Sequence, residues 1–96
     1  MKTSPFTARK TLRAINFVCS AAEAQSVSLV GDFNHWNASA HPMKRMADGA
    51  WLLTVELNHG HHRYAFWVDD RLTLDPQAHG ITRNDKGERV SLMPVS

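Results

Sequence analysis

Apolar and polar residues alternate along much of this chain, and turn residues interrupt the alternation about every 8–12 residues. A period of two is typical of strands that bury one face, whereas the apolar residues of a surface helix repeat with a period of about 3.6. The clearest alternation places four residues on one face: Trp51, Leu53, Val55 and Leu57. The pattern therefore predicts an all-β domain.

About seven short strands are expected from the alternation and from β-branched and aromatic residues. They cover residues 11–18, 26–31, 51–57, 62–68, 71–74 and 88–95, with 43–46 leading into a hairpin. The turns carry Asp48-Gly49, Asn58 to His61 and Asp69-Asp70, and the polar stretch 77–87 is expected to be a loop. Short strands at this spacing indicate an immunoglobulin-like β-sandwich.

The strand predicted at 62–68 matters most for function. Its alternation points Tyr64, Phe66 and Val68 inward and Arg63, Ala65 and Trp67 outward. We therefore expect Tyr64 and Phe66 in the core, together with Trp51. Trp67 is expected on the outer face of a sheet.

Length and charge limit the organisation of the chain. Its 96 residues fit one domain. The first basic residues all precede the first acidic residue, Glu23: Lys2, Arg9, Lys10 and Arg13. We expect residues 1–9 to be a flexible basic leader and residues 10–96 to form the sandwich domain.

Cysteine content and hydropathy bear on the compartment. Cys19 is the only cysteine, which excludes an internal disulfide and a cysteine-based zinc site. No apolar run has the length of a signal peptide or of a membrane span. A cytoplasmic protein without a membrane partner is therefore expected.

One motif lies between Val27 and Trp36 and reads Gly-x-Phe-Asn-x-Trp, with Gly31, Phe33 and Asn34 at its fixed positions. It resembles the signature of the early-set domains of carbohydrate-binding module family 48. These include the N-terminal modules of isoamylases and branching enzymes and the glycogen-binding domain of the AMP-activated kinase β subunit. We expect Gly31 to permit a tight backbone exit, Phe33 to turn into the core and Asn34 to bond neighbouring backbone.

Three later motifs match the same family in order and spacing. They are Asp48-Gly49-Ala50-Trp51, then Gly60 followed by Tyr64 to Asp69, and then Asp75-Pro76. With them the resemblance covers most of the chain. It implies a non-catalytic module that binds an α-glucan such as glycogen or maltodextrin and needs no cofactor.

The sugar contacts of the kinase-type domains are matched only in part. Trp36 is kept as an aromatic platform for a glucose ring. Ala65 stands where those domains have a Lys, and Leu72 stands where they have a second sugar-stacking Trp. The place of a sugar-bonding Asn falls on Val90 or Ser91.

A relocated platform would compensate for these differences. Trp67 lies two residues after the small Ala65 and on the same outward face, so its indole is accessible. We expect Trp36 and Trp67 to stack on the sugar and Arg63 to hydrogen-bond its hydroxyls. The expected carbohydrate site therefore consists of four residues: Trp36, Trp67, Arg63 and Leu72.

An interaction module is the main alternative. Trp67 and Leu72 would also suit a surface that binds a protein partner, or a second copy of the chain in a homodimer. Nucleic-acid binding through the basic leader is disfavoured, because no recognised surface interleaves aromatic and basic residues.

Three features invite catalytic or metal chemistry but do not support it. Asp69 and Asp70 are adjacent turn residues that point apart, and glycoside hydrolysis needs two carboxyls that face across a cleft. The run His59-Gly60-His61-His62 lies in a hairpin turn and has no matching Cys, Asp or Glu nearby in sequence to complete a metal site. Cys19 has no signature of a nucleophile's partner. We therefore expect no enzyme, no catalytic residue and no metal.

Overall fold

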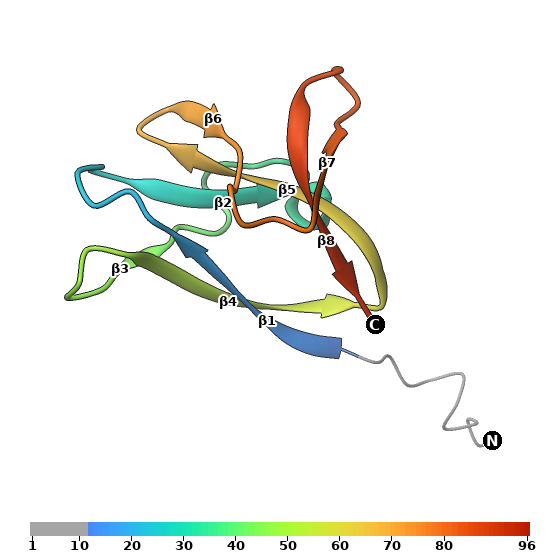
Figure 1. Cartoon of the computed structure of the whole chain (residues 1–96), viewed down its shortest axis with the longest axis horizontal. Coiled ribbons are helices and arrows are strands. Elements are labelled where there is room, and N and C mark those ends of the chain that lie inside the picture. Colours follow the sequence, from blue (N-terminus) through green and yellow to red (C-terminus); the bar gives the residue numbers. More distant parts are fainter. Residues whose placement is uncertain (1–11) are drawn as a thin grey trace.

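Eight strands form two antiparallel sheets within residues 12–96, the part of the chain that the computed structural model describes (Figure 1). The smaller sheet has the order β1-β4-β3, with β1 at Leu12–Cys19, β4 at Trp51–Asn58 and β3 at Lys44–Arg45. The larger sheet has the order β2-β5-β8-β7. Its strands are β2 at Val27–Gly31, β5 at Gly60–Val68, β8 at Arg89–Val95 and β7 at Gly80–Arg83.

Two further elements adjoin these strands of the larger sheet. The strand β6, at Arg71–Thr73, pairs with the end of β5, while β8 pairs with the beginning of the same strand. A single 3-10 turn, η1 at Asp32–Asn34, follows β2 directly. The predicted all-β immunoglobulin-like sandwich is therefore confirmed.

The core lies between the two sheets and draws on both. Its buried strand residues are Phe17, Cys19, Val27, Leu29, Trp51, Leu57, Tyr64, Phe66 and Val95. Tyr64 packs edge-on against Phe17, with ring centroids 4.9 Å apart, and also meets Phe66 at 5.9 Å. The expectation that Trp51, Tyr64 and Phe66 belong to the core is confirmed.

One predicted loop contains a strand. Residues 77–87 were expected to be a polar loop, but Gly80–Arg83 form β7, which pairs antiparallel with β8 from Gly80 opposite Leu92 to Arg83 opposite Arg89. Ile81 is 55% exposed and β7 has no fully buried residue, so its own sequence carries little apolar signal. Pairing with β8 supplies the reason for the strand. Figure 1 shows the two as a hairpin that extends away from the smaller sheet.

The predicted turns occur, with one adjustment. Gly49 adopts a positive φ of 91° in the hairpin that it was expected to form, and Asp69 and Asp70 have φ of 46° and 69°. The turn expected at Asn58 to His61 is narrower, because β4 ends at Asn58 and β5 begins at Gly60. The chain thus passes from one sheet to the other through His59.

Gly31 is needed for space rather than for its conformational freedom. Its φ of −173° is extended backbone that any residue adopts. A Cβ at this position would lie 2.5 Å from Phe33 Cε2 and 2.7 Å from the carbonyl oxygen of Arg63. The expected reason, a tight backbone exit, is therefore replaced by a steric one. The absent side chain lets Phe33 fold back against the core, as predicted.

Two remaining expectations concern the N-terminal leader and membrane-spanning segments. The leader expected at residues 1–9 lies outside the described residues. Among residues 12–96, no helix is long and apolar enough to cross a membrane.

Candidate functional site

A second apolar cluster lies on the outer face of the larger sheet. Its floor is Val30, Ala65 and Val90, each at most 2% exposed. Half-buried side chains cover this floor: Trp36, Ala38, Trp67 and Leu72. Ala65 does lie on the outward face, as its strand position predicted, but it is covered rather than open. The small side chain provides room for the indoles above it.

The turn after β5 places Trp67 and Leu72 together. In the register of β5 and β6, Trp67 is directly opposite Leu72. The Asp69 carboxylate oxygen Oδ1 accepts hydrogen bonds from the backbone N–H groups of Gln25 and Ser26, each at 2.9 Å. These bonds tie the turn to the segment before β2. Asp69 therefore has a structural part.

Asn34 positions the loop that carries Trp36. Its side-chain oxygen accepts the backbone N–H of Gly31 at 3.0 Å, and its Nδ2 donates to the carbonyl of Leu29 at 3.0 Å. The predicted bonding of Asn34 to neighbouring backbone is thus confirmed. His35 and Trp36 follow with φ of 57° and 58°, which turns the chain back over β2. The backbone N–H of Trp36 donates to the carbonyl of Gly31 at 2.9 Å.

These elements border a groove of about 430 Å³, which we call the tryptophan groove. Its lining residues are Val30, His35, Trp36, Trp67, Leu72, Asn84, Asp85, Lys86 and Glu88. The floor and one wall are apolar or aromatic, whereas the opposite wall is the polar turn between β7 and β8. Ligand sites commonly combine an apolar surface with a few convergent polar groups in this way.

Hydrogen bonding by the indole N–H distinguishes Trp36 and Trp67 from Trp51. The Nε1 of Trp51 donates to the carbonyl of Ala21 at 2.9 Å, as expected of a core residue. Within residues 12–96, the Nε1 atoms of Trp36 and Trp67 have no such partner, and no buried side-chain nitrogen or oxygen lacks one. Each of these two indole N–H groups is therefore a donor that a ligand can use.

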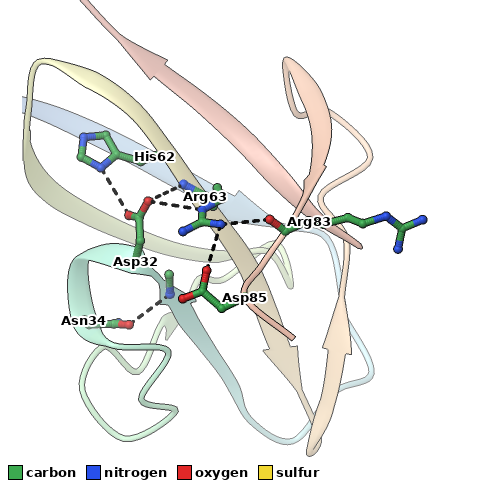
Figure 2. A network of polar contacts seen from close by, with 7 residues as sticks. Asp32, Asn34, His62, Arg63, Arg83 and Asp85 are labelled. Atoms are coloured by element: carbon green, nitrogen blue, oxygen red, sulfur yellow. Dashed lines mark hydrogen bonds and ion pairs between the residues drawn. The ribbon is translucent and has the colours of Figure 1, made fainter. Parts of the chain in front are cut away.

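Arg63 lies beside the tryptophan groove, not in its lining. Its Nη1 donates to the carbonyl of Arg83 at 3.0 Å and lies 3.5 Å from the Asp85 carboxylate (Figure 2). Its backbone N–H donates to Asp32 Oδ2 at 2.9 Å, and its Nε lies 4.0 Å from the same oxygen. Of the four residues predicted for the site, the structure brings Trp36, Trp67 and Leu72 together and places Arg63 next to them.

Sequence reasoning missed the polar wall of the groove. Asn84, Asp85 and Lys86 fall within the stretch 77–87, which was expected to be a polar loop, and Glu88 was expected to begin the last strand. The sequence Asn84-Asp85-Lys86-Gly87 is a turn signal with β-branched residues on both sides, Ile81 and Thr82 before it and Val90 after it, and Gly87 has a φ of 80°. Reading that signal as a hairpin would have placed these residues at the edge of the outer face.

A larger apolar groove, of about 790 Å³, opens elsewhere, where Cys19 and Ala21 meet Leu74 and Ala78. Burial raises the pKa of the Cys19 thiol, and the nearby Asp75 carboxylate adds to this effect. A raised pKa disfavours the reactive thiolate form of Cys19. The Asp75 carboxylate accepts hydrogen bonds from the Tyr64 hydroxyl and from the backbone N–H of Gln77.

The histidine-rich turn adopts a structural arrangement. His62 Nδ1 lies 3.4 Å from Asp32 Oδ1, and its Nε2 lies 2.9 Å from the carbonyl oxygen of Asn58. Across residues 12–96, no three His, Cys, Asp or Glu side chains are grouped so that they would hold a metal ion.

Comparison with known proteins addresses the family. The family model of carbohydrate-binding module 48, the isoamylase N-terminal domain, matches residues 5–86. Among curated proteins, the chain is similar to the 1,4-alpha-glucan branching enzyme GlgB of a Bradyrhizobium strain, with 42% identity over 52 residues. This match covers 54% of the chain and 7% of the enzyme.

Two further relatives carry the same description. GlgB of Deinococcus radiodurans is 40% identical over 57 residues, covering 59% of this chain and 8% of the enzyme. GlgB 2 of Xanthomonas campestris is 38% identical over 72 residues, covering 70% and 10%. The chain thus spans a tenth or less of the length of these curated relatives. The match over residues 5–86, on a two-sheet sandwich with the expected motifs in place, shows that the chain belongs to the carbohydrate-binding module 48 family.

Proposed function

We propose that this chain binds an α-1,4-linked glucan, such as glycogen or a maltodextrin, in the tryptophan groove, and that this domain does not catalyse a reaction. One observation carries the proposal. Trp36 and Trp67 are half-buried over the floor of Val30 and Ala65, and both line the groove. Because the chain belongs to a family of carbohydrate-binding modules, a sugar is the ligand that this arrangement suits best.

The chemistry of a glucan fits the two sides of the groove. A glucose ring has an apolar face of C–H groups and an edge of hydroxyls. The C–H face packs on an aromatic ring, since the large apolar surface of an indole is then removed from water. The hydroxyls need donors and acceptors, which the indole N–H groups and the turn between β7 and β8 can supply.

The carboxylates at the groove do not suit hydrolysis. Glycosidases place two carboxyl groups on opposite sides of the scissile bond, about 5–10 Å apart. Asp85 and Glu88 belong to one turn and therefore lie on one wall of the groove. Glu88 is also held by the side chain of Asn84 at 2.9 Å. Binding without catalysis is the function that this set of side chains supports.

Affinity electrophoresis tests the proposal directly. The whole chain is run in native gels with and without glycogen, and in a third gel with a soluble β-linked glucan of similar viscosity. Retardation by glycogen alone is the expected result. Equal mobility in all three gels would contradict α-glucan binding.

Self-association is the second candidate, because Trp67 and Leu72 leave an apolar patch at the edge of the larger sheet. It predicts that the molar mass from light scattering rises with protein concentration and that Trp67→Ala abolishes the rise. A constant monomer mass, together with retardation by glycogen, favours the glucan site.

A further inference from the structure

The polar wall of the tryptophan groove comes from a single turn that is fixed from within. The Asn84 side-chain oxygen accepts the backbone N–H groups of Lys86 and Glu88, at 3.0 Å and 2.9 Å. The Asn84 Nδ2 donates to Glu88 Oε1 at 2.9 Å. Arg83 Nη1 closes the turn by donating to the carbonyl of Gly87 at 2.6 Å. The turn therefore behaves as a preformed unit, and its attachment to the sheet decides where its side chains lie.

Arg63 provides that attachment. On one side its Nη1 holds the Arg83 carbonyl and the Asp85 carboxylate (Figure 2). On the other side its backbone N–H is held by Asp32, the first residue of η1, which leads into the loop of Trp36. One residue of β5 thus connects the aromatic wall of the groove with its polar wall.

Two side chains of the turn are available to a ligand. Among residues 12–96, the Lys86 ammonium has no hydrogen bond or ion pair, and Lys86 lines the groove. Asp85 is 93% exposed in its side chain and shares only one of its oxygens with Arg63. An ammonium and a carboxylate donate to and accept from adjacent sugar hydroxyls, respectively.

We propose that Lys86 and Asp85 supply the hydroxyl contacts of the glucan site and that Arg63 is a positioning residue, which holds their turn opposite Trp36 and Trp67. This inference rests on the proposed glucan binding. It also changes the role expected of Arg63 from the sequence, where it was to meet the sugar itself. The hydrogen bond to the Arg83 carbonyl is the main constraint, because an ion pair to so exposed a carboxylate contributes little.

Titration calorimetry with maltoheptaose on the whole chain provides the test. We expect Lys86→Gln to weaken binding about fivefold and Lys44→Gln, its control on the exposed strand β3, to leave binding unchanged. Arg63→Gln should also weaken binding about fivefold. Its control is Arg13→Gln, since Arg13 likewise donates to a backbone carbonyl, that of Ser96, but on the other sheet.

A double-mutant cycle separates positioning from direct contact. If Arg63 acts through the turn, Lys86→Gln weakens binding less than twofold further once Arg63→Gln is present. If Arg63 touches the sugar independently, the two losses multiply to about 25-fold, which overturns the positioning role. Asp85→Asn keeps the shape of the side chain and should weaken binding two- to threefold. The Asp85→Asn variant therefore tests the polar wall even if Arg63→Gln lowers the stability of the fold.

The outcomes also separate this inference from the proposed function. If the wild-type chain binds maltoheptaose, Trp36→Ala weakens binding, and the Arg63 and Lys86 variants bind like wild type, only the polar-wall proposal is overturned. If the wild-type chain does not bind maltoheptaose, both proposals are overturned.

Discussion

Trp67 in β5 lies directly opposite Leu72 in β6, and both side chains pack on the outer face of the larger sheet. The pairing depends on a turn of only two residues, Asp69 and Asp70, both with positive φ. Such turns match the twist of the strands that they join. The position of one aromatic side chain of the groove is therefore set by the turn that follows its strand.

The Asp69 carboxylate should stabilise this turn more than that of Asp70. Asp69→Ala removes the acceptor of two backbone N–H groups, whereas Asp70→Ala changes a residue with the same backbone strain but without those bonds. We expect Asp69→Ala to lower the free energy of unfolding by about 1–3 kcal/mol more than Asp70→Ala. Urea unfolding measures the difference, and equal losses would contradict the assigned bonds.

Replacement of Gly31 should destabilise the fold through a steric clash. The Cβ of Gly31→Ala would meet Phe33 and the Arg63 carbonyl at 2.5–2.7 Å, so the side chain of Phe33 must leave its packing. The expected loss is about 1–3 kcal/mol, typical of overpacking. Gly80→Ala is the matched control, since its Cβ would have only ordinary contacts from 3.7 Å. Similar melting temperatures for the two variants would refute the steric explanation.

Tyr64 should resist ionisation in the folded chain. Burial raises the pKa of its hydroxyl above the usual value of about 10, and the hydrogen bond to Asp75 and the charge of Asp75 raise it further. The unfolded chain then loses this proton first, so stability is complete below about pH 10 and declines as the pH rises above it.

The rise in absorbance at 295 nm on tyrosinate formation reports on Tyr64 alone, because it is the only tyrosine. The native chain should show no tyrosinate until it unfolds, whereas the chain in urea should titrate near pH 10. Tyr64→Phe should flatten the alkaline loss of stability. A native titration midpoint equal to that in urea would contradict the buried hydrogen bond.

Much of the fold was predictable because its signals are local. The alternation in β4 and β5 predicted which side chains face the core between the sheets. The motif from Gly31 to Trp36 carries its own hydrogen bonds through Asn34. The strand β7 was not predictable in this way. Its residues have little buried apolar surface, and it is ordered by pairing with β8.

The site was predictable to the extent that it follows from strand faces. Trp67 and Leu72 were placed on the outer surface by alternation and by a short turn, and Trp36 by the motif. The role of Arg63 depends on its contacts with Asp32, Arg83 and Asp85, which lie 20–31 residues from it in the sequence. Contacts over such separations are set by the tertiary fold, and an alternating pattern shows only that Arg63 faces outward.

The affinity of the two tryptophan variants for maltoheptaose tests the central claim most directly. Stacking a sugar on an indole removes ~50 Å² of apolar surface from water, or ~1.3 kcal/mol, which is about tenfold in affinity. We predict that Trp36→Ala and Trp67→Ala each weaken binding by about this factor, while Ile81→Ser, an exposed apolar residue outside the groove, does not. If Trp36→Ala abolishes binding and Trp67→Ala leaves it unchanged, the platform shared by the two tryptophans is contradicted.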